Sequence, residues 1–106
     1  MSTNYYLKDG SNKIHIGKKS FGRRFLFQEV VDEDKVINNE RDLFDFLKNK
    51  IKSKAKFVDE YDRKVEINDF IDLVKSSKNE SMNHERNPNI HLYHRSLLDF
   101  IDTDFY

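Results

Sequence analysis

The clearest pattern of apolar and polar positions lies in the middle of the chain. An apolar stripe recurs there at helical spacing and consists of Leu43, Phe44, Leu47 and Ile51. Asn39 is a favoured N-cap residue, and Asp42 stands three residues later in a capping-box-like position. Acidic residues gather in the first turn and lysines in the last, as the helix dipole prefers. The pattern predicts a helix over residues 40–52.

Two runs of strand-forming residues near the start of the chain predict a β-hairpin. Residues 13–16 form the first run, 17–20 a glycine-containing turn, and 21–27 the second run. Alternate side chains of a strand share a face, so Phe21, Phe25 and Phe27 are expected on one face of the second strand. Arg23 falls on the same face, which indicates partial burial or a bulge at Gly22. Residues 29–34 extend the second strand and end it in an acidic turn.

The second half of the chain repeats this rhythm more loosely. Residues 57–67 predict another hairpin around an acidic turn at 59–63. A shorter helix follows, capped by Asn68 or Asp69, and its inward side chains are Phe70, Ile71 and Val74. Residues 76–89 are almost free of apolar side chains and predict a long surface loop. Residues 90–94 predict a last strand, after which the tail pairs at a sheet edge or forms a turn of helix.

Together these elements predict an α+β fold. We expect a small, mostly antiparallel sheet, built from hairpins and packed against one or two helices. With 106 residues, the chain is expected to form a single domain over residues 1–106. Nine Phe and five Tyr supply much apolar area from few residues, so we expect an aromatic-rich core.

Composition narrows the class of protein. Hydrophobic residues make up 37% and charged residues 36%, with a formal net charge of zero, which argues against strong non-specific nucleic-acid binding. No apolar run approaches the length of a membrane span or follows the N-terminus as a signal peptide would. The chain has no cysteine, which removes disulfides and thiolate metal sites and suits the cytoplasm.

Charge is segregated along the chain. A basic side is expected if the first hairpin and the end of the first helix share a face, and its candidate contact residues are Lys18, Lys19, Phe21, Arg23, Arg24, Lys50, Lys52 and Lys54. Such a patch suits a phosphate backbone, with an aromatic ring to stack on bases. The alternative is a solvated helix end. The acidic turn offers a second candidate surface, formed by Asp59, Glu60 and Asp62.

Patterns typical of catalysis or metal binding are weak. His91 and His94 differ by an odd number, so on a strand they face opposite sides and do not form a metal site. The serines lie in no nucleophile elbow, and three scattered glycines provide no phosphate loop. Clustered carboxylates suit solvated turns better than acid–base pairs. We therefore expect no enzyme activity, no catalytic residues, no metal site and no cofactor.

Three segments carry a resemblance to a known group of proteins. The sequence reads Thr-Asn-Tyr-Tyr-Leu at residues 3–7, Ile-His-Ile-Gly-Lys-Lys-Ser-Phe-Gly at 14–22 and Asp-Glu-Tyr-Asp-Arg-Lys-Val at 59–65. In this it resembles small bacteriophage-encoded proteins with a Thr-Asn-Tyr-Tyr-Leu run and a His-Ile-Gly-Lys-Ser hairpin. Those proteins usually carry a Cys-Pro-x-Cys pair between the Thr-Asn-Tyr-Tyr-Leu run and the hairpin, which looks like half of a zinc site. This chain lacks the pair, so the resemblance does not imply a zinc site here. Their Trp after the second Gly is Arg23, and their Gly in the third segment is Asp62.

The resemblance and the residues favour one class of function. We expect a phage or prophage accessory protein of the host cytoplasm that binds a host or defence protein stoichiometrically, for example a CRISPR component, and inhibits it. One alternative is an accessory protein that binds nucleic acid through the basic hairpin. Another is a virion or structural component. No membrane partner is expected.

Overall fold

The computed structural model describes residues 2–32, 34–81, 83, 92–95 and 98–101. Its strands are β1 (Ser2–Asp9), β2 (Asn12–Ser20), β3 (Leu26–Gln28), β4 (Val30–Asp32), β5 (Lys35–Ile37), β6 (Lys56–Asp59), β7 (Leu92–Arg95) and β8 (Leu98–Ile101). Its helices are α1 (Glu40–Lys52) and α2 (Ile67–Ser77). The expected α+β fold is confirmed.

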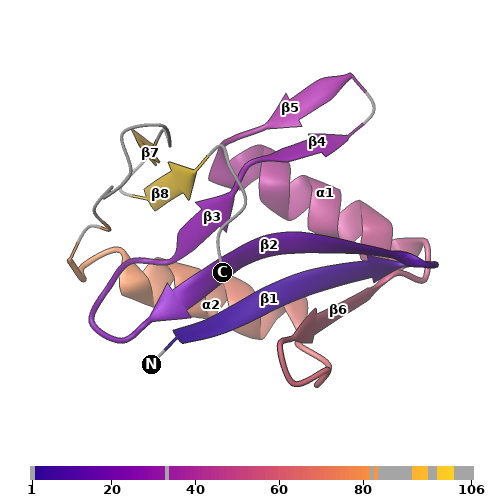
Figure 1. Ribbon diagram of the computed structural model, residues 1–106, viewed down its shortest axis with the longest axis horizontal. Helices are drawn as coiled ribbons and strands as arrows, with labels where there is room; N and C mark the ends of the chain where they lie inside the picture. Colours follow the sequence, from indigo (N-terminus) through magenta and orange to yellow (C-terminus); the bar gives the residue numbers. More distant parts are fainter. Residues whose placement is uncertain (1, 33, 82, 84–91, 96–97, 102–106) are drawn as a thin grey trace.

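Within the described part of the chain, six strands form one sheet in the order β6-β1-β2-β3-β8-β7. Neighbouring strands are antiparallel except β3 and β8, which run parallel. Both helices lie behind the same face of this sheet, and the separate β4–β5 ribbon continues from the end of β3 and projects away from the sheet (Figure 1). The sheet is mostly antiparallel and packs against two helices, as predicted.

The core between the sheet and the helices is aromatic. Phe70 of α2 meets the rings of Phe25 and Phe57 edge-on, with centroids 5.1 and 4.7 Å apart, and Phe27 stacks on Phe100 at 4.7 Å. Each of these five side chains is at most 2% exposed. Burial of such rings contributes about 2–3 kcal/mol each, so Phe70 links α2 to the sheet through this cluster.

Helix α1 confirms the predicted bounds and cap. The Asn39 side chain accepts a hydrogen bond from the Asp42 backbone N–H at 2.9 Å. The predicted apolar stripe is only partly correct, because Phe46 is buried with Leu43 and Leu47, whereas Phe44 and Ile51 are half-buried. Phe46 lies beside Ile37 at a small cavity beneath β5, a strand that the sequence did not predict.

The first hairpin prediction placed the turn wrongly. Gly17 lies inside β2, which extends to Ser20 and pairs along its length with β1; the turn of that hairpin is at Gly10 and Ser11. A Cβ at Gly17 would lie 2.3 Å from the Leu26 carbonyl oxygen and 2.5 Å from the Phe25 ring. The glycine therefore permits close strand packing rather than a turn. The second run also begins later, since β3 starts at Leu26 and Phe21 lies in a turn.

The second predicted hairpin is present only as a single β-bridge. The segment after the 59–63 turn pairs with β6 only through the Val58–Lys64 bridge, and β6 pairs along its length with β1 instead. Helix α2 begins at Ile67, with Glu66 in the N-cap position and no side-chain cap, so Asn68 and Asp69 are not the cap. Phe70 and Val74 are buried as expected, whereas Ile71 is half-buried.

The C-terminal predictions are met in part. Residues 76–77 belong to α2 rather than to the predicted 76–89 loop, and much of that loop lies outside the described residues. Strand β7 covers part of the predicted 90–94 strand. Strand β8 lies between β3 and β7, so the tail segment enters the interior of the sheet rather than its edge.

Candidate functional site

The candidate site is the turn that connects β2 to β3. The Arg23 backbone N–H donates to the Ser20 carbonyl at 3.1 Å, and Gly22 has a φ of +73°. This geometry is that of a type II turn, which requires a positive φ at its third residue and favours glycine there. Phe21 occupies the second position and is 92% exposed. The turn therefore presents a large apolar ring to solvent.

The end of α2 and the segment after it hold this turn in place. The Ser81 N–H donates to the Gly22 carbonyl at 3.3 Å, and the Arg24 N–H donates to the Ser81 carbonyl at 2.9 Å. The buried Ser77 hydroxyl accepts from the Phe25 N–H at 3.0 Å and donates to the Val74 carbonyl at 2.8 Å. These bonds to Gly22, Arg24 and Phe25 hold the backbone on the β3 side of the turn.

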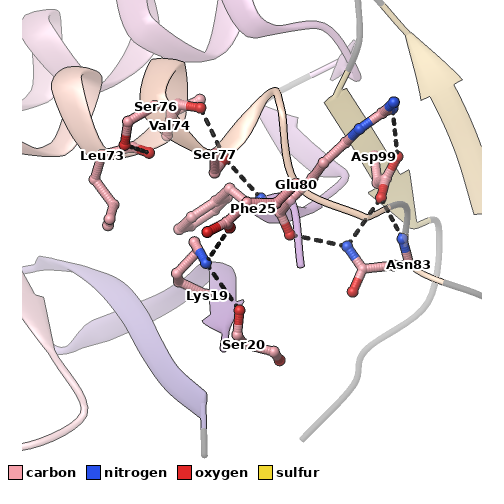
Figure 2. Close-up of polar contacts among 11 residues, drawn as sticks. Lys19, Ser20, Phe25, Leu73, Val74, Ser76, Ser77, Glu80, Asn83 and Asp99 are labelled. Atoms are coloured by element: carbon pink, nitrogen blue, oxygen red, sulfur yellow. Dashed lines mark hydrogen bonds and ion pairs between the residues drawn. The ribbon is translucent and has the colours of Figure 1, made fainter. Parts of the chain in front are cut away.

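Charged side chains extend the same network (Figure 2). Lys19 Nζ lies 2.6 Å from Glu80 Oε2, and Arg24 Nη1 lies 3.6 Å from Oδ1 of the fully buried Asp99. Asn83 donates to Asp99 Oδ2 through its backbone N–H at 2.7 Å and its side chain at 2.9 Å. The buried Asp99 carboxylate is thus paired with a positive charge and hydrogen-bonded, which offsets the free-energy cost of burying it.

The structure places the predicted basic residues in two groups. Lys18, Lys19, Arg23 and Arg24 surround the Phe21 turn. Lys50, Lys52 and Lys54 lie at the end of α1, where Lys50 Nζ is 3.1 Å from Asp9 Oδ2. Asp9 ends β1 beside the hairpin turn, whereas Lys18 pairs with Asn4 near the other end of the hairpin. The two groups therefore lie at opposite ends of the hairpin, and a single basic side is not formed.

The predicted acidic residues have different environments. Asp59 is 8% exposed; its Oδ1 accepts the Tyr61 and Arg63 N–H groups, and its Oδ2 accepts Arg63 Nε at 2.9 Å. Burial alone would raise the Asp59 pKa, but these hydrogen bonds and the Arg63 charge bring it below its ordinary value. A hydrogen bond from Lys8 lowers the pKa of Asp62. Asp59 thus organises the turn, while Glu60 and Asp62 are exposed.

His15 is buried beside Tyr6, and its Nε2 lies 3.0 Å from Asn4 Oδ1. Within the described ranges, no three His, Asp or Glu side chains gather as metal ligands, and no helix is long and apolar enough to cross a membrane. His84 and His91 lie outside the described residues.

Sequence reasoning missed the residues that hold the Phe21 turn. Ser77 falls in the predicted surface loop, and the sequence offers no pattern that distinguishes Glu80, Ser81 and Asn83 from solvated polar residues. Ser77 bonds to Phe25, 52 residues away, and Asn83 bonds to Arg24, 59 residues away, and to Asp99, 16 residues away, so no local spacing identifies them.

In comparisons with known proteins, no family model, no curated protein and no solved structure matches this chain.

Proposed function

We propose that this chain is a small, non-enzymatic accessory protein of phage or prophage origin that acts in the host cytoplasm. It binds a host or defence protein stoichiometrically and inhibits it. The observation that carries the proposal is Phe21, which is 92% exposed on a turn fixed by hydrogen bonds from the end of α2 and the segment after it. The resemblance to small phage proteins supports the origin, and Phe21 supports the mode of action.

A preorganised aromatic side chain is an efficient binding anchor. Aromatic residues buried at the centre of an interface often dominate its free energy, and a rigid backbone lowers the entropy lost on association. Four basic residues lie around this turn against the two acids Glu80 and Asp99, so the local charge is positive. The partner is expected to offer an apolar pocket with an acidic rim.

The geometry favours a protein partner over nucleic acid. A nucleic-acid interface is a continuous basic stripe, whereas here the two basic groups lie apart. In addition, Lys19, Arg24 and Lys50 each form an ion pair with an acid of the same chain.

The test is affinity capture from the lysate of a susceptible host, with and without nuclease. We expect one stoichiometric protein that survives nuclease treatment and binds the purified chain directly. Phe21→Ser should weaken that binding by about thirtyfold, the loss typical of a central aromatic anchor. Tyr61→Ser is the matched control, since Tyr61 is also exposed but lies on a different turn.

Two outcomes contradict the proposal. Loss of the captured protein after nuclease treatment would assign the interaction to nucleic acid. Equal binding by the Phe21→Ser variant and the native chain would remove the turn as the contact surface.

A further inference from the structure

A second surface feature lies far from Phe21, at the edge of the sheet formed by β6. It is an open groove of about 630 Å³, within the usual range for small-molecule sites. Its apolar lining comes from the end of α1, β6, the start of α2 and the segments that connect them: Ile51, Ala55, Phe57, Val58, Val65 and Ile67. Its charged rim consists of Lys8, Lys56, Asp62, Lys64 and Glu66.

The outer edge of β6 is already closed by its own chain. The Asp59 N–H donates to the Arg63 carbonyl at 3.0 Å, and the Val65 N–H donates to the Phe57 carbonyl at 2.9 Å. The Val58–Lys64 bridge lies between these two bonds. An additional strand therefore finds few open backbone groups here, and the groove suits a compact apolar molecule better than an extended peptide.

The rim carries excess positive charge. Lys8 and Lys56 are directly opposite in the β1–β6 register, an arrangement in which like charges repel. Asp62 pairs with Lys8, and Glu66 Oε1 lies 3.3 Å from Lys64 Nζ. Lys56 forms no ion pair within the described part of the chain, and its charge helps to lower the pKa of Asp62. Three lysines against two acids leave one positive charge, centred on Lys56.

The start of α2 adds to this field. Ile67 is the first residue of α2 and lines the groove, and Glu66 gives the helix no side-chain cap. The first backbone N–H groups of a helix lack intrahelical acceptors and carry a partial positive charge. Glu66 at the N-cap and Asp69 in the first turn offset part of this charge, so the helix start adds only weakly to the preference for an anion that Lys56 creates.

We propose that the groove binds a small molecule with an apolar body and one anionic group. The apolar body packs against the lining residues, and the anion lies near Lys56. The site is separate from the Phe21 turn, because Lys8 and Ser2, which pairs with Ser20, are six residues apart along β1, or about 20 Å. The proposal does not depend on the proposed function.

The probe is 8-anilinonaphthalene-1-sulfonate, an aromatic sulfonate, titrated at neutral pH and followed by fluorescence. We expect saturable binding of one molecule per chain, and weaker binding of the uncharged analogue N-phenyl-1-naphthylamine. Lys56→Glu should weaken sulfonate binding about fivefold through charge reversal. Lys48→Glu, on the exposed face of α1, is the matched control and should bind as the native chain does.

Amide chemical-shift mapping on the native chain makes the test independent of variant folding. The largest shifts on adding the sulfonate should fall at Phe57, Val65 and Ile67. The proposal is overturned if fluorescence does not saturate, if the uncharged analogue binds equally well, or if the shifts centre on another part of the chain.

Discussion

At the residue scale, Lys54 illustrates how a local conformation constrains a side chain. The Ala55 N–H donates to the Lys50 carbonyl at 3.0 Å and the Lys54 N–H to the Ile51 carbonyl at 3.1 Å, which together form a Schellman motif that ends α1. Lys54 therefore has a φ of 72°, in the left-handed region that glycine favours. A lysine does not indicate this conformation, so residue type alone predicts Lys54 only as a contact residue.

We expect Lys54→Gly to stabilise the fold. Relief of the left-handed conformation outweighs the greater entropy of glycine in the unfolded chain, for a net gain of about 0.5–1 kcal/mol in the free energy of unfolding. Urea denaturation measures this change. Ser53→Gly is the control, because Ser53 has a φ of −87° and should gain nothing. Equal effects of the two changes would contradict this account of Lys54.

Asp62 is the second non-glycine residue with a positive φ, at 63°. Aspartate tolerates this region better than most side chains, and here it also pairs with Lys8.

At the element scale, the link between α2 and β3 depends on Ser77. Its hydroxyl accepts the Phe25 N–H and is 1% exposed, so no solvent can replace it. Ser77→Ala leaves that N–H without its acceptor and should lower the free energy of unfolding by about 1–3 kcal/mol.

The neighbouring serine provides a matched control for this prediction. Ser76 is exposed and donates only to the Leu73 carbonyl of its own helix, so Ser76→Ala should change stability by less than about 0.5 kcal/mol. Thermal unfolding of both variants gives the comparison. If Ser77→Ala is as stable as Ser76→Ala, Ser77 does not hold the Phe21 turn.

At the scale of the whole molecule, Asp59 couples stability to pH. Its pKa lies below the ordinary value, so the folded state binds fewer protons than the unfolded chain in the acid range. The stability that Asp59 contributes is therefore complete above its unfolded pKa, near 4, and is lost as pH falls through the folded value.

We expect Asp59→Asn to be less stable than the native chain at pH 7. The gap should narrow as pH falls below about 4, because protonation removes the charge of the native carboxylate. Urea midpoints between pH 7 and 3 test this, with Asp34→Asn as the exposed control. A gap that stays constant over this range would show that the Asp59 charge does not contribute.

The local signals in the sequence predicted some elements well. Helix α1 and its Asn39 cap follow from spacing and capping over a few residues, and the structure agrees in both bounds. The α+β class follows from the sum of such signals. The position of Phe21 could not be obtained in this way, because strand periodicity grouped it with the buried Phe25 and Phe27.

The sequence by itself determined the class of fold, the first helix, the aromatic character of the core and the candidate residues. Only the tertiary structure decided which of those residues act together. It placed Gly17 within a strand, Asp59 at the end of β6 with its carboxylate bonded to the turn that follows, and the two basic groups at opposite ends of the hairpin. The physical reason is that helix signals lie within one or two turns, whereas sheet register and ion pairing join residues far apart in the chain.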